Sequence, residues 1–472
     1  MRARLSRPVM GAGTLVARRP QLTFWGLAAL GVLVLAPLVT RPTYALLLPV
    51  ALLAVWLAWL SPAIPLALGG IPPLVDAIVG TDPLPKGGFT LLFSAWIALG
   101  VGFMIMRGAH RAASRALLSV PALASLFLLG LMVFRLGSSP DQVYGSMKVE
   151  LYVADVLIFF IGAIFVGSRR ADLQLFFVVF LALITVSSLL FLVQLIDGAA
   201  QQVINGRFSL ATQEYPIDLA RASADGLLVA IYFLLSADRR SLRVPVALAT
   251  PVVAIAMLAA GSRGPVVAFA VGLIALLALS ATTPRARRRF AVLGVMFALV
   301  AIVVPLVVPS SSIGRALSTV VGSASGLSSN GRSALWAAAI SSFSHHFALG
   351  LGTGGFAAQP AAVSDLVQYP HNLFLEVASE LGIIGLVAIL TAVIGLAARL
   401  AALWRFTTGE DKLLSAILFS LFLTALTNAC ISEAIYGNAE VWLWGGLGLG
   451  MWSGMTQGFG WPRWRPDVAR AG

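Results

Sequence analysis

Apolar stretches of roughly membrane-spanning length recur along almost the whole chain, and this pattern restricts its fold more than any other feature. The hydrocarbon core of a bilayer is ~30 Å thick, so a helix needs about 20 mostly apolar residues to cross it. The stretches that approach this requirement are 22–39, 44–60, 62–80, 88–106, 115–135, 150–167, 173–196, 218–236, 243–260, 265–281, 290–308, 372–398, 413–430 and 440–456. We therefore predict an all-α, polytopic integral membrane protein with about fourteen transmembrane helices, or twelve as the alternative, in a single transmembrane domain over residues 1–472.

The composition agrees with a membrane protein and excludes most soluble classes. Hydrophobic residues make up 59% and charged residues 11% of the chain, with a mean hydropathy of +0.93, whereas soluble domains have about 25% charged residues. Disordered, collagen-like, secreted disulfide-rich and cytosolic proteins are excluded on this basis. The one cysteine, Cys430, permits no intramolecular disulfide. The net charge of +13 falls in short runs between the apolar stretches, so it indicates orientation in the membrane and no nucleic-acid partner.

Lysine and arginine are concentrated in alternate connections between the spans, which predicts the orientation of the chain. If the basic N-terminus is cytoplasmic, the even-numbered connections of a fourteen-span topology and the C-terminal tail are cytoplasmic too. Together these segments contain 23 of the 32 lysines and arginines, as the positive-inside rule requires. We therefore expect both termini in the cytoplasm and no removed signal peptide. The weakest span is 62–80, whose prolines make it a candidate for a broken or re-entrant segment.

One outer connection, over residues 309–370, is much longer than most of the others. Long loops with structure of their own commonly carry function. This loop begins rich in serine and glycine, and Asn330 then precedes an amphipathic segment over 332–340 that predicts a short helix at the membrane surface. A glycine-rich turn from Gly350 to Gly355 follows this helix.

Among the arginines on the predicted outer side, where the positive-inside rule disfavours them, two are the strongest candidates for an anion site. Arg263 lies in the short turn 261–264 between two spans. Either its side chain anchors the helix by extending toward the membrane surface, or its planar guanidinium binds a phosphate bidentately. Arg207 lies in the middle of a second long outer connection, over about 197–216, and we favour a functional role for it.

Two further outer arginines are weaker candidates for the same anion site. Arg221 lies at the outer end of the span 218–236, and the alternative to anion binding is an ion pair with Asp218 or Asp225. Arg332 begins the predicted surface helix, at the end where the helix dipole disfavours a cation. Its expected partner is therefore an anion, either a phosphate or a lipid headgroup.

A single histidine, His371, stands at the predicted outer start of the span 372–398, between Pro370 and Asn372. A lone histidine is commonly a structural residue. At this boundary, however, an imidazole can accept or donate a proton near neutral pH. We therefore predict a catalytic role for His371, with Tyr369 and Asn372 as supporting residues.

Four carboxylates fall inside otherwise apolar spans, namely Asp155, Asp225, Glu376 and Glu380. Such groups are costly in a membrane and usually face a polar cavity or a charged partner. Glu376 and Glu380 are four residues apart, so they share one face of a helix. They either form an ion pair with a buried arginine or support the site of His371.

Motifs for nucleotides and for metal-bridged substrates are missing from the sequence. It contains no D-x-D motif and no Walker A lysine motif, although a metal-bridged diphosphate normally requires carboxylate ligands. We therefore expect no metal and no cofactor. A cluster of outer arginines with one histidine suits a diphosphate leaving group that arginine neutralises.

Several outer motifs, taken in order, resemble the O-antigen ligase and O-antigen polymerase superfamily. They are Gly261-Ser-Arg-Gly264 between two spans, Arg332-x3-Trp336, Gly350-x-Gly352-x-Gly354-x-Phe356 and His371-Asn372-x2-Leu375-x4-Glu380-x-Gly382-x2-Gly385-Leu386. The resemblance covers roughly residues 200–400, and the first half of the chain is similar only in hydropathy.

The resemblance implies a multi-pass glycosyltransferase of the bacterial inner membrane. Members of the superfamily transfer a glycan from undecaprenyl diphosphate to an acceptor on the periplasmic face. By this resemblance Arg207 and Arg263 bind the diphosphate, and His371 is implicated in activating the acceptor. The loop 309–370 and the active site would then be periplasmic, and membrane lipids would surround the protein.

Taken together, these observations predict a metal-independent, inverting glycosyltransferase. Its donor would be an undecaprenyl-diphosphate-linked glycan, and Arg221 and Arg332 would join the diphosphate site. The span count favours a polymerase of surface polysaccharide, either O-antigen or exopolysaccharide. The alternatives are an O-antigen ligase that acts on the lipid A core of lipopolysaccharide and a protein O-oligosaccharyltransferase. A transporter or flippase is the alternative from another class, and inverted repeats would mark it.

Overall fold

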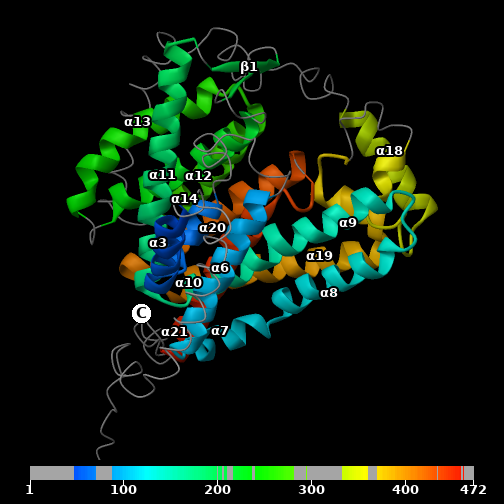
Figure 1. Cartoon of the computed structure of the whole chain (residues 1–472), viewed down its shortest axis with the longest axis horizontal. Coiled ribbons are helices and arrows are strands. Elements are labelled where there is room, and N and C mark those ends of the chain that lie inside the picture. The colour runs from blue at the N-terminus through cyan, green and yellow to red at the C-terminus, as the bar shows by residue number, and fades with distance from the viewer. Residues whose placement is uncertain are drawn as a thin grey trace, which may run out of the picture.

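The computed structural model of the chain describes residues 47–70, 88–198, 200–204, 207–209, 216–236, 240–280, 294, 332–359, 369–432, 434–458 and 461. Within these residues the chain is helical almost throughout, and the helices form one bundle (Figure 1). The elements are α3 (Leu47–Leu60), α4 (Ala63–Gly69), α6 (Gly88–Met106), α7 (His110–Leu117), α8 (Val120–Leu136), α9 (Gln142–Leu151), the π-helix η2 (Tyr152–Ile158), α10 (Phe159–Gly167), α11 (Arg170–Ile196), β1 (Gln201–Ile204), β2 (Arg207–Ser209), α12 (Pro216–Leu235), η3 (Arg240–Leu242), α13 (Arg243–Ala259), α14 (Arg263–Ser280), α18 (Arg332–His345), η4 (Gly355–Ala358), α19 (Leu373–Phe406), α20 (Gly409–Ile431) and α21 (Ala439–Gln457).

The helices confirm the prediction of a helical, polytopic membrane protein. The helices α11, α12, α13, α14, α20 and α21 begin and end within a few residues of the predicted spans. Among the described residues, five helices are long and apolar enough to cross a membrane, with Gln142–Gly167 taken as one, or six if a bent pair counts as a span. The number fourteen stays a prediction, because the predicted spans 22–39 and 290–308 lie outside the described residues apart from Gly294.

The chain bends sharply where the predicted spans 44–60 and 62–80 meet, and whether 62–80 is itself broken or re-entrant stays a prediction. Residues 51–60 and 63–69, in α3 and α4, form a pair bent by 117°. The bend falls at Pro62, which has no backbone N–H to donate and whose ring crowds the preceding turn. Just before it, the Ser61 hydroxyl donates to the Asp172 carboxylate at 2.6 Å, which ties the bend to α11. Residues 71–80 lie outside the described part of the chain.

The described part of the predicted outer connection 197–216 contains a short β-hairpin. The strands β1 and β2 pair antiparallel. The sequence between them is Asn205-Gly206, the dipeptide that most favours a two-residue hairpin turn. The strand β2 packs against α12, so the hairpin lies at the start of that helix.

Glycines bring α21 close to the backbone of the preceding α10 helix. Gly446, Gly450 and Gly454 recur every fourth residue on one face of α21, and a Cβ at any of them would overlap a carbonyl oxygen of residues 160–168. Small residues at this spacing let two helices approach without side chains between them. The helix α21 therefore packs inside the bundle, where it also contacts α19 and α20.

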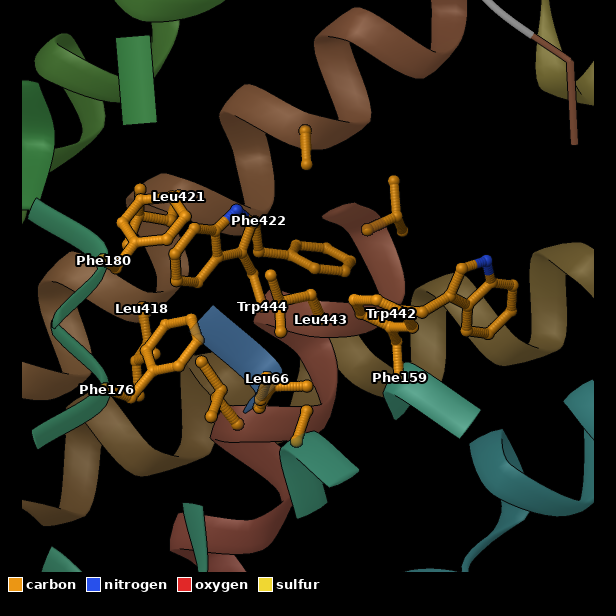
Figure 2. Close-up of a cluster of buried hydrophobic side chains, with 14 of the residues drawn as sticks. Leu66, Phe159, Phe176, Phe180, Leu418, Leu421, Phe422, Trp442, Leu443 and Trp444 are labelled. Carbon is orange, nitrogen blue, oxygen red and sulfur yellow. The ribbon is translucent and has the colours of Figure 1, made fainter. Parts of the chain in front are cut away.

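Two fully buried tryptophans of α21 organise the centre of the bundle. The Trp444 ring packs edge-on against Phe176 and Phe180 of α11, and the Trp444 Nε1 donates to Asp225 at 2.8 Å. The structure thus supplies a polar partner for one of the four acids that lie inside spans. Figure 2 shows how the cluster joins side chains of five helices: Leu66 of α4, Phe159 of α10, Phe176 and Phe180 of α11, Leu418, Leu421 and Phe422 of α20, and Trp442, Leu443 and Trp444 of α21.

Candidate active site

The start of α14 and the turn before α19 both contact the last turn of α20. The side-chain amide of Asn372 donates to the carbonyl of Cys430 at 2.8 Å. One residue further along α20, Ile431 lies against Gly264, where a Cβ would be 3.2 Å from the Ile431 Cδ1. Asn372 directly follows His371, and Gly264 directly follows Arg263. The fold therefore brings the backbones of these two predicted functional residues to the same end of α20.

His371 has an unusual backbone conformation. Its φ of 55° makes it the one residue other than glycine with a positive φ in the described part of the chain. Histidine tolerates this region better than most residues, but the conformation still costs on the order of 1–3 kcal/mol and is commonly found at functional sites. The surrounding structure holds it: the Asn372 side chain caps α19 by accepting from Phe374 and Leu375, each at 3.0 Å. The Tyr369 ring meets the imidazole edge-on, with the ring centroids 4.5 Å apart.

The predicted helix after Asn330 is present as α18, which packs next to this turn, while its place at the membrane surface stays a prediction. The Trp336 Nε1 donates to the Pro370 carbonyl at 3.0 Å. On the same helix, buried Leu335 belongs to a small apolar cluster with Phe356 of η4. The helix and the segment before His371 therefore form one packed unit.

Arg263 and Arg332 share a structural feature, because each is the first residue of its helix. The turn before Arg263 is as short as predicted: α13 ends at Ala259, and Gly261 has a φ of 68°. The first turn of a helix presents backbone N–H groups and the positive end of the helix dipole. A cation at this position is unfavourable unless an anion lies nearby, and a guanidinium beside a helix N-terminus makes a strong anion-binding site.

Arg207 begins β2, and this strand packs against α12, the helix that carries Arg221. The backbone of the predicted Arg207 loop therefore lies beside the helix that follows it.

Arg221 is buried, and all three nitrogens of its guanidinium have partners near the start of α21. Its Nη2 lies 3.0 Å from a carboxylate oxygen of Glu440 and donates to the Asn438 side chain, also at 3.0 Å. Its Nε donates to Glu440 at 3.2 Å, and its Nη1 donates to the Gly437 carbonyl at 3.4 Å. The partners that the sequence suggested, Asp218 and Asp225, lie on the same helix as Arg221. Glu440 was not predicted, because no sequence pattern links α12 to a residue more than two hundred positions later.

Glu376 and Glu380 meet a buried cation, as one alternative predicted, but the cation is a lysine instead of the expected arginine. The Lys148 Nζ donates to both carboxylate oxygens of Glu380, at 2.8 and 2.7 Å, and it also forms an ion pair with Glu376. All three side chains are buried. The Glu380 carboxylate additionally accepts from the Gly354 N–H at 2.9 Å. This cluster joins α9 to α19 and to the glycine-rich segment before η4.

The glycine-rich segment 349–355 fits into a break in α19. Gly382 interrupts the helix with a φ of 65° and a ψ of −162°. Backbone hydrogen bonds then cross the break, and Gly352 donates to the Glu380 carbonyl at 2.9 Å. Arg135 of α8 donates to two carbonyls of the segment, each at 3.0 Å. Arg135 thus has a structural role that the sequence did not indicate.

Metal-ligand side chains do not gather around the described part of the site. The described residues contain no group of three or more His, Cys, Asp or Glu side chains placed to hold a metal ion. The chemistry that these residues offer is the binding of anions by guanidinium and helix N-termini, together with proton transfer by one imidazole.

Comparison with known protein families identifies the segment that contains most of these residues. Residues 246–390 match the family described as O-antigen ligase. The match includes Arg263, Arg332, His371 and Glu380, so it confirms the resemblance to the O-antigen ligase and polymerase superfamily that the motifs indicated. No curated protein matches the chain.

Proposed function

We propose that this protein is a metal-independent, inverting glycosyltransferase of the bacterial inner membrane. It would move a glycan from undecaprenyl diphosphate to an acceptor hydroxyl at the periplasmic face. The family match supports a function of the O-antigen ligase or polymerase type in general. The observation that carries the residue assignment is the convergence of the starts of α14 and α19 on the last turn of α20.

In this proposal Arg263 and Arg332 bind the diphosphate of the donor, together with Arg207. Two of these arginines begin helices, so guanidinium groups and backbone N–H groups would act on the same anion. Negative charge increases on the diphosphate as the bond between the sugar C1 and the phosphate oxygen breaks. Donors fixed in advance stabilise that charge most strongly in the transition state.

His371 would orient the acceptor hydroxyl and accept its proton. The hydroxyl oxygen attacks C1 from the side opposite the diphosphate, so the new C–O bond inverts the anomeric centre. Undecaprenyl diphosphate leaves with the electron pair of the broken bond, and the proton of the hydroxyl passes to the imidazole. Tyr369 and Asn372 fix the ring and the backbone of His371, while α18 supports the turn that precedes it.

The proposal does not assign Arg221 to the diphosphate site, where the sequence placed it. Its guanidinium is directed to Glu440, Asn438 and Gly437. We therefore propose that Arg221 positions the segment between α20 and α21. This segment directly follows the last turn of α20, which the backbones of His371 and Arg263 approach. Lys148 would similarly support the site by holding Glu376 and Glu380 of α19 in place.

The acceptor is proposed to be a growing lipid-linked glycan, which would make the protein a polymerase. The test is deletion of the gene in its own host, complemented with wild type, Arg263→Ala or His371→Asn, with surface glycan examined on a gel and membrane expression checked. A polymerase predicts glycan of a single repeat in the deletion strain and no rescue by either variant. Unattached long lipid-linked chains would indicate a ligase instead. Full rescue by both variants would contradict the proposed catalytic site.

A further inference from the structure

A polar cavity of about 170 Å³ lies inside the bundle, between η2, α12 and the start of α21. Its charged lining comes from three elements that are far apart in the sequence. They are Asp155 of η2, Asp218 and Arg221 of α12, and Glu440 of α21. A group of charges inside a membrane bundle is costly and normally marks a functional site.

The described lining of the cavity bears more carboxyl groups than cations, which bears on the class of ligand. Asp155, Asp218 and Glu440 contribute carboxyl groups, and Arg221, the one guanidinium among the described lining residues, is paired with Glu440 at 3.0 Å. A diphosphate would meet repulsion from these carboxyl groups, so the cavity does not suit the leaving group of the donor. Nor are the carboxyl groups arranged to hold a metal ion among the described residues. Carboxyl oxygens are instead good acceptors for the hydroxyl groups of a neutral ligand.

Asp155 lines the cavity from a helix that is locally widened. It lies in the π-helical turn Tyr152–Ile158, within an otherwise α-helical rod, and π-helical turns often occur at functional sites. Thr90 of α6 also lines the cavity and hydrogen-bonds to the Asp155 carboxyl. Tyr436 adds an aromatic ring to the wall. Hydrogen-bonding carboxyl groups beside an aromatic ring form a typical lining for a small polar ligand with an apolar face.

The cavity is connected to the candidate active site through one short segment. The chain leaves the last turn of α20, where Asn372 and Gly264 make contact, and reaches the cavity at Tyr436 and Glu440. The volume is well below the roughly 300–1,000 Å³ of pockets for drug-sized ligands. It therefore suits a single sugar ring better than an oligosaccharide.

We infer that this cavity binds one hydroxyl-bearing sugar ring, with Asp155 accepting a hydrogen bond from a sugar hydroxyl. The ring belongs to either the donor glycan or the acceptor glycan. This inference rests on the proposed function, because it assumes that glycans reach this end of the bundle.

The test uses the full-length protein in lipid nanodiscs and the purified undecaprenyl-diphosphate-linked glycan of its host. Turnover is measured over a range of donor and acceptor concentrations for wild type, Asp155→Asn and Thr90→Val. Asp155→Asn is expected to raise the KM for one of the two glycans by about tenfold or more, with kcat largely retained, because an amide NH2, which can only donate, replaces one of the two accepting carboxyl oxygens and the remaining amide oxygen is a weaker acceptor. A rise for the donor places the donor ring in the cavity, and a rise for the acceptor places the acceptor ring there.

Ser94→Ala is the matched control. The Ser94 hydroxyl donates to the Ala154 carbonyl at 2.8 Å, so this variant alters the same contact between α6 and η2 without changing the cavity lining. It should leave both KM values unchanged. Unchanged KM values for Asp155→Asn and Thr90→Val, in protein that unfolds at the wild-type temperature, would overturn the inference. The inference would also be overturned if Asp155→Asn changed only the dependence of turnover on sodium or on pH, because that result would indicate a cation or proton site.

A second measurement separates this inference from the proposed function. Glycan released from the donor by mild acid is added to the nanodiscs, and its binding is followed by saturation-transfer NMR. Binding that Asp155→Asn weakens, in a protein that never transfers glycan, would support the cavity and reject the proposed function. Normal transfer that Arg263→Ala abolishes and Asp155→Asn leaves unchanged would reject the cavity alone.

Discussion

The Lys148 ammonium binds both carboxylate oxygens of Glu380, at 2.8 and 2.7 Å, although 232 positions separate the two residues in the sequence. Glu376 shares the same ammonium. Lys148 is completely buried, and each carboxylate is almost completely so. The cluster therefore holds α9 against α19 at the level where the glycine-rich segment enters the break of α19.

Removal of the cation alone should destabilise the protein strongly. Lys148→Met leaves two buried carboxylates without their ammonium, and breaking a buried ion pair in this way costs about 3–5 kcal/mol. We expect a clear fall in the thermal unfolding temperature of the protein in nanodiscs. The triple variant Lys148→Met/Glu376→Gln/Glu380→Gln should recover much of the loss, because no unpaired charge remains. An unchanged unfolding temperature for Lys148→Met would show that the cluster contributes little.

A methyl group at Gly350 should disrupt the junction between the glycine-rich segment and α19. Gly350 has a φ of 66°, and a Cβ there would overlap the backbone of Glu380 and Leu381. Gly350→Ala is therefore expected to lower stability by about 2 kcal/mol or more, from backbone strain and the overlap together. Gly130→Ala is the control, because that position of α8 faces open space and should be neutral or slightly stabilising. Equal unfolding temperatures for the two variants would contradict the packing described here.

The backbone conformation of His371 determines which substitution tests its chemistry. Asparagine tolerates a positive φ better than alanine does, so His371→Asn preserves the turn and removes the imidazole. We expect kcat to fall by about 10²–10⁴-fold, the usual contribution of a general acid or base, with the unfolding temperature and the KM for donor little changed. Retention of the wild-type kcat in His371→Asn would exclude the proposed proton transfer.

Arg221 should contribute to stability rather than to donor affinity. Arg221→Met removes the guanidinium from Glu440, Asn438 and Gly437, which should cost about 2 kcal/mol because hydrogen bonds to a charged group are lost. Arg221→Lys should rescue only part of the loss, since a single ammonium cannot replace the planar fork. The unfolding temperature and the donor KM are measured together. A raised donor KM at normal stability would show that Arg221 contacts the donor directly, either at the diphosphate, as the sequence predicted, or at a sugar ring in the cavity that Arg221 lines.

Much of the fold could be predicted from hydrophobic length alone. The spans 173–196, 243–260 and 413–430 correspond closely to α11, α13 and α20, because an apolar helix in a membrane satisfies its own backbone. The bend at Pro62 was also readable, since proline has a local effect. The hairpin was not predicted, although Asn205-Gly206 favours a hairpin turn, because strands of four and three residues are too short to show a period-two pattern.

The candidate site was predictable in its residue types and less so in its contacts. Arg263 and Arg332 were recognisable because both lie on the predicted outer side, where the positive-inside rule disfavours arginine, and Arg332 also begins a predicted helix, where the dipole disfavours a cation. The partners of Arg221 and Glu380 were not recognisable, because an ion pair between distant helices leaves no periodic trace in one sequence. The break at Gly382 was hidden for a related reason, since only the packed segment 349–355 supplies the hydrogen bonds that stabilise it.

The most direct test of the central claim is the rate of undecaprenyl diphosphate release from the lipid-linked donor by purified protein, with Arg263→Ala compared with wild type. Arg243→Ala is the matched control. Arg243 also begins a helix, α13, but Arg263 lies just beyond the opposite end of that helix. We predict that Arg263→Ala lowers the rate by about 10²–10³-fold, as loss of a preorganised donor to a developing negative charge does, whereas Arg243→Ala retains it. Equal rates for Arg263→Ala and wild type would contradict the assignment of the diphosphate to the start of α14.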